Sequence, residues 1–221
     1  MIKTVDLYKY YRTTDVETTA LHHVNLDVKA GEFIAIMGPS GCGKSTLLNI
    51  LGMLDQPSKG RYFFDGVETS ALKEAKLSDL RKGKVGFVFQ HFNLIDELTV
   101  YENVEQPLVY LRMKGRERKA RAEKILERMK MGHRRAHFPR QLSGGQKQRV
   151  ALCRAVVASP KLILADEPTG NLDSKNGIEV MHLLRELNEE GTTIVMVTHS
   201  TRDAEFAHGV VKLFDGKVVG N

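Results

Sequence analysis

Four short apolar runs, each followed by a polar loop, recur along the chain. They are FIAIM (33–37), VGFVF (85–89), LILA (162–165) and TIVMV (193–197). Because these runs are continuous and rich in Ile and Val, they predict strands buried on both faces, as in a parallel sheet covered by helices. Apolar residues at helical spacing fill two of the intervals: Ala122, Ile125, Leu126 and Met129, and then Ile178, Met181, Leu184 and Leu187. Strands that alternate with helices indicate an α/β fold.

The stretch 91–157 differs from the rest because it has helix and loop patterns without a convincing strand. We therefore predict a helical subdomain at 91–157, inserted between two segments of the core, 1–90 and 158–221. A length of 221 residues suits one sizeable domain, so we treat 1–221 as a single unit of function.

The composition is that of an ordinary globular protein, with 42% hydrophobic and 27% charged residues. No apolar run approaches the roughly 18 residues that a membrane span needs, and the first residues lack the apolar region of a signal peptide. We therefore expect a cytoplasmic location. The two cysteines, Cys42 and Cys153, form no metal-binding pattern.

Positive charge is concentrated in one segment, which we call the basic segment (112–140). It holds twelve Lys or Arg residues and three Glu residues, a local charge of +9 in a chain whose net charge is +6. Such a segment is compatible with a solvated helix face, with a nucleic-acid face or with a face toward an anionic membrane. The charge alone does not separate these three interpretations.

A glycine-rich loop follows the first apolar run directly. Gly38, Gly43, Lys44 and Ser45 match the pattern G-x-x-x-x-G-K-[ST] between a strand and a helix. Glycines let backbone N–H groups surround phosphates, Lys44 can reach the β- and γ-phosphates, and the Ser45 hydroxyl can ligate Mg²⁺. The predicted phosphate-binding residues are Gly38, Pro39, Ser40, Gly41, Cys42, Gly43, Lys44, Ser45 and Thr46. The loop therefore predicts a nucleoside triphosphate site.

Two carboxylates end the third apolar run. Asp166 and Glu167 would lie at the carboxyl edge of the sheet, where open α/β sheets bind ligands. Asp166 can hold Mg²⁺, and Glu167 is placed to polarise an attacking water. We therefore predict hydrolysis as well as binding.

A second anion-binding helix start is predicted at LSGGQKQR (142–149), where Ser143, Gly144 and Gly145 open a helix. With this stretch the whole chain resembles the ABC-transporter ATPases, whose signature is L-S-G-G-Q. The resemblance implies a P-loop NTPase core of RecA-like type with a mostly parallel sheet and a small antiparallel β subdomain near the N-terminus. It also implies ATP and Mg²⁺ as cofactors. In this family two ATPase subunits form a head-to-tail sandwich, in which residues such as Ser143, Gly144, Gly145 and Gln146 contact the ATP held by the other copy.

The resemblance assigns roles to further residues. Gln90 matches the glutamine that contacts Mg²⁺ and water, Asp173 of GNLD (170–173) matches the loop that couples the two sites, and His199 matches the histidine at the γ-phosphate. Tyr11 matches the aromatic residue that stacks on adenine, although Tyr8 and Tyr10 stay possible because strand parity does not separate them. The implied catalytic set is Glu167, His199, Lys44 and Gln90, and the implied metal set is Ser45, Gln90 and Asp166.

Narrower stretches, such as LGMLDQPSKG and ADEPTGNLDSKNG, look like the branch of macrolide exporters, lipoprotein-release ATPases and cell-division ATPases. This implies a transmembrane permease as partner, a second copy of the chain, and a place at the inner face of the cell membrane. The substrate is not implied. An alternative is a soluble ABC ATPase of DNA repair or chromosome maintenance, but the chain lacks the coiled-coil or zinc-binding insertions of those proteins, so no nucleic-acid partner is expected.

Overall fold

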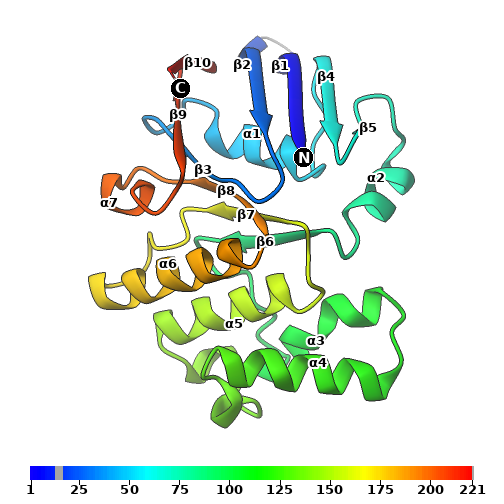
Figure 1. Ribbon diagram of the computed structural model, residues 1–221, viewed down its shortest axis with the longest axis vertical. Helices are drawn as coiled ribbons and strands as arrows, with labels where there is room; N and C mark the ends of the chain where they lie inside the picture. Colours follow the sequence, from blue (N-terminus) through cyan, green and yellow to red (C-terminus); the bar gives the residue numbers. More distant parts are fainter. Residues whose placement is uncertain (13–16, 221) are drawn as a thin grey trace. The chain divides into compact units, whose positions relative to one another are not determined.

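The computed structural model of the chain describes residues 1–12 and 17–220, and these form two compact units. The first unit contains residues 1–81 together with the chain from Leu187 onward, and the second contains Lys82–Glu186 (Figure 1).

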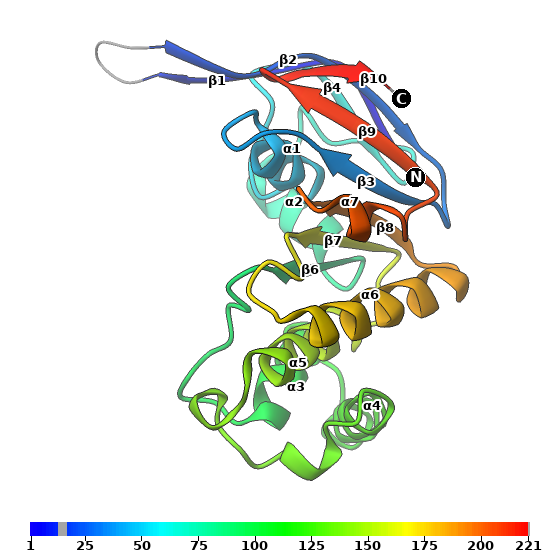
Figure 2. The same cartoon turned by 90° about the vertical axis from the view of Figure 1, so that its left-hand side faces the viewer.

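An antiparallel sheet makes up one layer of the first unit. Its strands are β1 (Ile2–Arg12), β2 (Glu17–Val28), β4 (Lys59–Phe64) and β5 (Val67–Glu68), in the order β2-β1-β4-β5. Strands β1 and β2 pair along most of their length and form a long hairpin (Figure 2). The predicted antiparallel β subdomain is therefore confirmed.

The other strands of the first unit are mostly parallel. They are β3 (Phe33–Met37), β8 (Thr193–Val197), β9 (Gly209–Phe214) and β10 (Lys217–Gly220), in the order β10-β9-β3-β8. Strands β8 and β9 both run parallel to β3, and only β10 runs antiparallel to its neighbour β9. The helices of this unit are α1 (Lys44–Leu51), α2 (Glu74–Arg81) and the short α7 (Thr201–Ala204).

In the second unit, two parallel strands, β6 (Val85–Phe89) and β7 (Leu162–Asp166), are accompanied by helices. These are α3 (Val100–Tyr110), α4 (Gly115–Arg128), α5 (Gly144–Val156) and α6 (Ser174–Glu189), and two 3₁₀ turns lie at Gly132–Arg134 and Pro139–Gln141. Residues 91–157, all of which are described, contain helices and turns and no strand. The helical character predicted for this stretch is therefore correct, whereas the subdomain limits at 91 and 157 stay predictions.

The four apolar runs form strands β3, β6, β7 and β8, as predicted, and the α/β fold class is confirmed. Of the stripe predicted for α4, Ala122, Leu126 and Met129 are almost fully buried, and Ile125 is half-buried. On α6 the prediction was wrong at Ile178, which is exposed. The buried stripe of α6 instead passes through Val180, because Val180 lies one helical turn before Leu184 and therefore on the same face of the helix.

Among the described residues, none of the helices combines the length and apolarity needed to cross a bilayer. Both cysteines are buried and reduced. Burial raises the pKa of the Cys153 thiol, as expected for a small packed side chain.

Candidate functional site

The glycine-rich loop joins β3 to α1 in the first unit. A Cβ atom at Gly38 would lie 2.0 Å from the carbonyl oxygen of Leu213. A Cβ atom at Gly43 would lie 2.4 Å from the carbonyl oxygen of Ala20. Gly43 also has a φ of +100°, which favours glycine. Close backbone packing therefore requires glycine at both positions. Between them, Pro39, Ser40 and Gly41 are exposed to solvent.

Lys44 points back into this loop. Its Nζ donates hydrogen bonds to the carbonyl oxygens of Gly38 (2.9 Å) and Pro39 (2.7 Å), and it lies 4.0 Å from the sulfur of Cys42. The side chain is only 9% exposed, so a desolvated ammonium is held at the centre of the turn. Ser45 and Thr46 follow in the first turn of α1, where backbone N–H groups lack helical partners and favour an anion.

Of the three tyrosines left open by the sequence, Tyr11 lies beside this loop. Its hydroxyl donates to a carboxylate oxygen of Asp55 (3.0 Å) and accepts a hydrogen bond from the Thr46 side chain, while its ring remains 44% exposed. Partial burial raises the pKa of Tyr11. In contrast, Tyr8 packs against His22, and Tyr10 stacks on Tyr8. This placement keeps Tyr11 as the predicted adenine-stacking residue.

His199 follows β8 at the same edge from which the loop leaves β3. Ile36 pairs with Val197 in the parallel register, so the chain from each strand continues side by side to Gly38 and His199. The N-cap of α7 is Ser200, whose hydroxyl accepts from the N–H of Asp203. His199 is therefore an exposed residue next to the loop and does not cap the helix itself.

In the second unit, β6 and β7 end together. Phe89 pairs with Asp166, which brings Gln90 next to Glu167 at the carboxyl edge. Glu167 has a φ of +46°, an uncommon conformation for a residue with a side chain, and its carbonyl oxygen accepts from the N–H of Gly170. A tight turn therefore fixes the backbone of Glu167 at the strand end.

The signature opens α5 as a capped helix. Ser143 is the N-cap, accepting from the N–H of Gln146, and the Gln146 side chain accepts from the N–H of Ser143 in return. Gly145 leaves no room for a side chain, since its Cβ would lie 2.3 Å from the Asn176 amide oxygen. Gly144 has ordinary space around it. The predicted residues thus form the N-terminus of a 13-residue helix, a natural place for an anion.

Asp173 caps the neighbouring helix, α6. Its carboxylate accepts from the backbone N–H of Asn176, and this hydrogen bond lowers the pKa of Asp173. In the same loop Asn171 donates to the carbonyl oxygen of Gln90 (2.9 Å). The GNLD loop is therefore tied both to Gln90 and, through Asn176, to Gly145 of the signature.

One residue of this network was missed by the sequence analysis. Gln148 is fully buried, and its amide nitrogen donates to the carbonyl oxygen of Pro168 (2.7 Å), the residue directly after Glu167. Its amide oxygen has no hydrogen-bond partner among the described residues. The available signal was a polar residue on the apolar stripe of α5, one turn before Leu152.

The loop after a buried parallel strand, the lysine within it and the carboxylates that end a parallel strand define the class of P-loop nucleotide-binding proteins. Residues 21–170 match the profile of the ABC transporter family, and the chain belongs to this family. The predicted family and fold are therefore confirmed.

Individual relatives point the same way. The chain is 49% identical over 219 residues to an uncharacterized ABC transporter ATP-binding protein, MJ1508, of Methanocaldococcus jannaschii, with 99% of this chain and 98% of that protein covered. It is 46% identical over 221 residues to the macrolide export ATP-binding/permease protein MacB of Vibrio parahaemolyticus, of which it spans 34%. A dimeric structure of the ATP-binding cassette MJ0796, in a post-hydrolysis state bound to ADP and Pi, matches with a TM-score of 0.93 and 47% identity over 100% of this chain and 97% of that one. The chain is thus an ATP-binding protein of an ABC transporter, similar to the MacB branch.

Proposed function

We propose that the chain hydrolyses Mg-ATP between two head-to-tail copies of itself and that this cycle drives a membrane permease. Membership of the ABC transporter family and the placement of both motif sets at carboxyl edges of parallel strands support this proposal. The permease would hold the chain at the inner face of the membrane and would select the cargo.

In this proposal the first unit binds the nucleotide. Backbone N–H groups of residues 40–46 and the ammonium of Lys44 bind the phosphates, and the exposed ring of Tyr11 stacks on adenine. The proposed metal ligands, Ser45, Gln90 and Asp166, offer only hydroxyl, amide and carboxylate oxygens, which fits Mg²⁺. The described residues form no cluster of three or more His, Cys, Asp or Glu side chains for a metal. Mg²⁺ prefers few protein ligands together with phosphate oxygens, and when bound it would neutralise phosphate charge.

Glu167 is the proposed general base, and the observation that carries this role is its backbone. The left-handed φ and the hydrogen bond from Gly170 fix the backbone of Glu167 at the strand end, where the register of β6 and β7 sets it beside Gln90. There Glu167 would accept the proton of the attacking water while Gln90 orients that water. His199 would contact the γ-phosphate from the loop after β8.

The signature helix supports a role for a second copy. Gly144 and Gly145 lie in the first turn of α5, where backbone N–H groups lack helical partners, and the P-loop of the same chain already provides one anion site. We assign this helix start to the γ-phosphate held by the partner copy. Asp173 and the GNLD loop would then couple the two ATP sites of the dimer, because this loop contacts Gln90 directly and the signature through Asn176.

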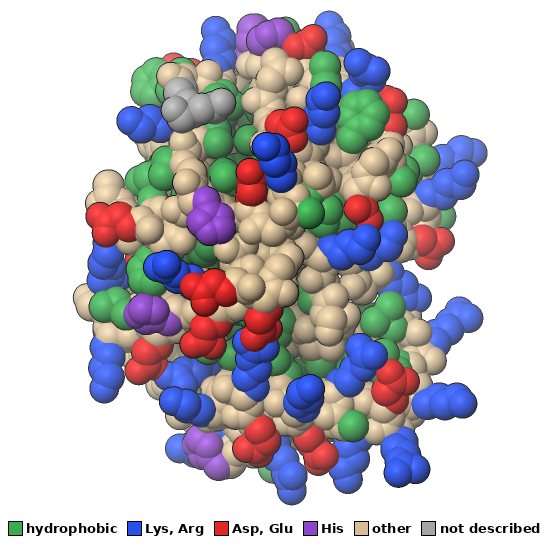
Figure 3. Space-filling model, in the orientation of Figure 1, with side chains coloured by type: hydrophobic (Ala, Val, Ile, Leu, Met, Phe, Trp, Pro, Cys, Tyr) green, Lys and Arg blue, Asp and Glu red, His purple; other side chains and the backbone are tan. Residues whose placement is uncertain are grey.

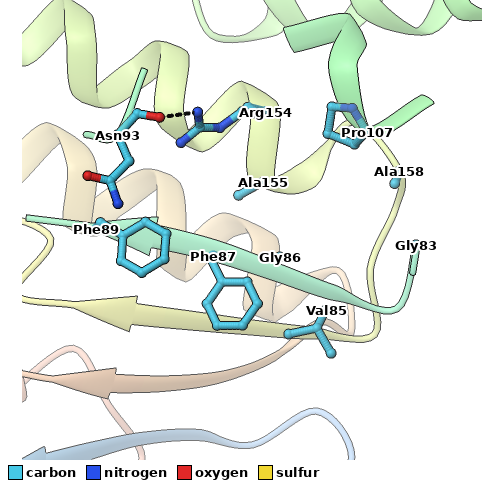
Figure 4. A pocket seen from close by; sticks show the side chains of 10 residues that line it. All are labelled: Gly83, Val85, Gly86, Phe87, Phe89, Asn93, Pro107, Arg154, Ala155 and Ala158. Carbon is cyan, nitrogen blue, oxygen red and sulfur yellow. Dashed lines mark hydrogen bonds between the residues drawn. The ribbon is translucent and has the colours of Figure 1, made fainter. Parts of the chain in front are cut away.

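A pocket in the second unit is the proposed docking site for the permease (Figure 4). Its volume is about 310 Å³, and the rings of Phe87 and Phe89, stacked 5.6 Å apart on β6, line it together with Pro107 of α3. Arg154 of α5 lies at one end and donates to the carbonyl oxygens of Phe92 and Asn93 in the loop that follows Gln90. An apolar segment of the permease seated here would therefore press on the loop that carries Gln90.

The test is the variant Glu167→Gln, with Glu68→Gln as a matched control on exposed strand β5. ATP binding should persist in Glu167→Gln while hydrolysis falls by about 10²- to 10⁴-fold, the usual contribution of a general base. The control should hydrolyse ATP at the parent rate. Hydrolysis by Glu167→Gln at the parent rate would remove Glu167 from the mechanism.

A further inference from the structure

The turn between α3 and α4 has an unusual combination of side chains. Tyr110, the last residue of α3, is 68% exposed, which is the highest value for a large hydrophobic side chain among the described residues. Val109 beside it is 43% exposed. An exposed aliphatic and an exposed aromatic side chain at adjacent positions form an apolar contact site that the chain itself does not cover.

Cations surround this apolar site. Four exposed basic side chains occur within ten residues after Tyr110, and none of them forms an ion pair among the described residues; they are Arg112, Lys114, Arg116 and Lys119. No Asp or Glu occurs from Gln106 to Arg116. Figure 3 shows Lys and Arg side chains gathered over α3 and α4. We call Val109, Tyr110 and these four cations the turn patch.

The nearest acidic side chains do not neutralise the turn patch, because other arginines use them. Glu105 pairs with Arg118 (2.8 Å), which also donates to the carbonyl oxygen of Met113. Glu117 pairs with Arg121 (3.1 Å), one helical turn away. Arg118 therefore connects α4 to α3, Arg121 is paired within α4, and the positive charge available to a partner comes from the other four cations.

We propose that the turn patch binds the surface of an anionic phospholipid membrane directly. The two kinds of side chain fit the two parts of such a surface: cations are attracted to anionic headgroups, and Tyr and Val gain by entering the boundary between headgroups and acyl chains. Nucleic acid would attract the same cations, but an exposed aliphatic side chain gains nothing from phosphates in water. The membrane is therefore the partner that uses the whole patch.

The expected strength is modest. Each cation near an anionic surface contributes on the order of fivefold to the partition constant, so the four together contribute on the order of several hundredfold at low salt. Screening over about 8 Å at physiological ionic strength weakens this. Such a contact suits a subunit that a permease already holds at the membrane, since it would orient the helices of the second unit without capturing the chain alone. The contact goes beyond the proposed function because it needs no permease.

The experiment is sedimentation of the full chain with vesicles, without any permease. Vesicles of phosphatidylcholine alone are compared with vesicles that also contain phosphatidylglycerol. We expect binding only to the second kind, and we expect it to weaken as salt rises. A variant with Arg112, Lys114, Arg116 and Lys119 each changed to Glu should lose binding at least about 100-fold. Tyr110→Ala should lose several-fold at every salt concentration.

The matched control reverses the same number of exposed charges elsewhere: Lys29, Lys73, Lys76 and Lys212, each changed to Glu. This control should bind the anionic vesicles as the parent does, or nearly so. Both fourfold variants should keep basal ATPase activity, which shows that they are folded. Equal loss in the two variants would overturn the proposal, since net charge alone would then explain binding. A parent that ignores the vesicles but binds duplex DNA through the turn patch would overturn it in favour of nucleic acid.

Discussion

Replacing Gln148 by Glu should make the stability of the protein depend on pH, in a direction that follows from one hydrogen bond. In Gln148→Glu the side chain keeps nearly the same shape, but an ionised carboxylate can only accept hydrogen bonds, and the Pro168 carbonyl oxygen that faces it also only accepts. The site is fully buried, which disfavours the charged form. A protonated carboxyl, in contrast, can donate its O–H to Pro168. Both effects raise the pKa of the introduced carboxyl above the ordinary value of about 4.3.

The stability of Gln148→Glu should therefore depend on pH in a defined direction. Since the folded state holds the proton more tightly, the variant is most stable below about pH 4.3 and loses stability as pH rises through the pKa of the folded state. A pKa raised by two units would cost about 2.7 kcal/mol at neutral pH relative to acid. Gln148→Leu, which leaves the Pro168 carbonyl unpaired, should cost about 1 to 3 kcal/mol without this pH dependence.

The assay is urea unfolding at pH 5 and pH 8, with Gln146→Glu as the control on the same helix. The Gln146 side chain accepts from the N–H of Ser143 at the helix N-terminus, where a carboxylate is favoured, so the pKa of that introduced carboxyl should fall. Gln146→Glu should therefore have its full gain in stability above about pH 4.3 and lose it only in more acidic solution, so its free energy of unfolding should not fall between pH 5 and pH 8, unlike that of Gln148→Glu. The same pH trend in both variants would refute the reasoning.

Because Pro168 follows Glu167, we also expect the hydrolysis rate of Gln148→Glu to fall more at pH 8 than at pH 5.

Two further variants test other parts of the account. Tyr11→Ala should weaken ATP binding by about 5- to 150-fold, the range for loss of one base-stacking contact, whereas Tyr10→Ala should leave ATP binding unchanged. A nucleotide-binding titration measures both variants, and equal effects would contradict the role proposed for Tyr11. Asn103→Leu should lower the free energy of unfolding by about 2 to 4 kcal/mol, because the buried Asn103 amide serves the carbonyl oxygens of Ile95, Leu98 and Thr99 and the N–H of Ile95. Denaturant unfolding measures this, and a loss below about 0.5 kcal/mol would show that the loop rearranges freely.

The parallel half of the fold could be predicted from the sequence, because strands buried on both faces leave unbroken apolar runs. Three of the four runs have the limits of the strand, and only β7 extends one residue further, to Asp166. The antiparallel half was predicted only through the family resemblance. Strand β1 contains register shifts between Thr4 and Leu7 and again between Leu7 and Lys9, with Asp6 at a φ of +47°. These bulges break the alternation of two residues on which strand prediction depends.

The same bulges explain why the alternation of side chains along the strand could not choose among Tyr8, Tyr10 and Tyr11.

For the site, the sequence indicated the residues that belong to motifs, but not the hydrogen bonds that hold them in place. Gln148 and Asn171 act through hydrogen bonds to backbone atoms of Pro168 and Gln90, and no spacing rule predicts such pairs. The role of Ser200 as the N-cap of α7 depends in the same way on a local hydrogen bond, which its hydroxyl accepts from the N–H of Asp203.

The most direct test of the proposed function is a mixture of two inactive variants. Lys44→Ala removes the cation of the P-loop, and Gly144→Asp places a negative charge at the signature, where the structure has room for a side chain. If ATP is hydrolysed between the P-loop of one copy and the signature of another, each variant alone is inactive, and the mixture regains hydrolysis at the one intact site of each mixed dimer. If each chain hydrolyses ATP by itself, the mixture stays as inactive as its components, or Gly144→Asp keeps the parent rate alone, and either result contradicts the account.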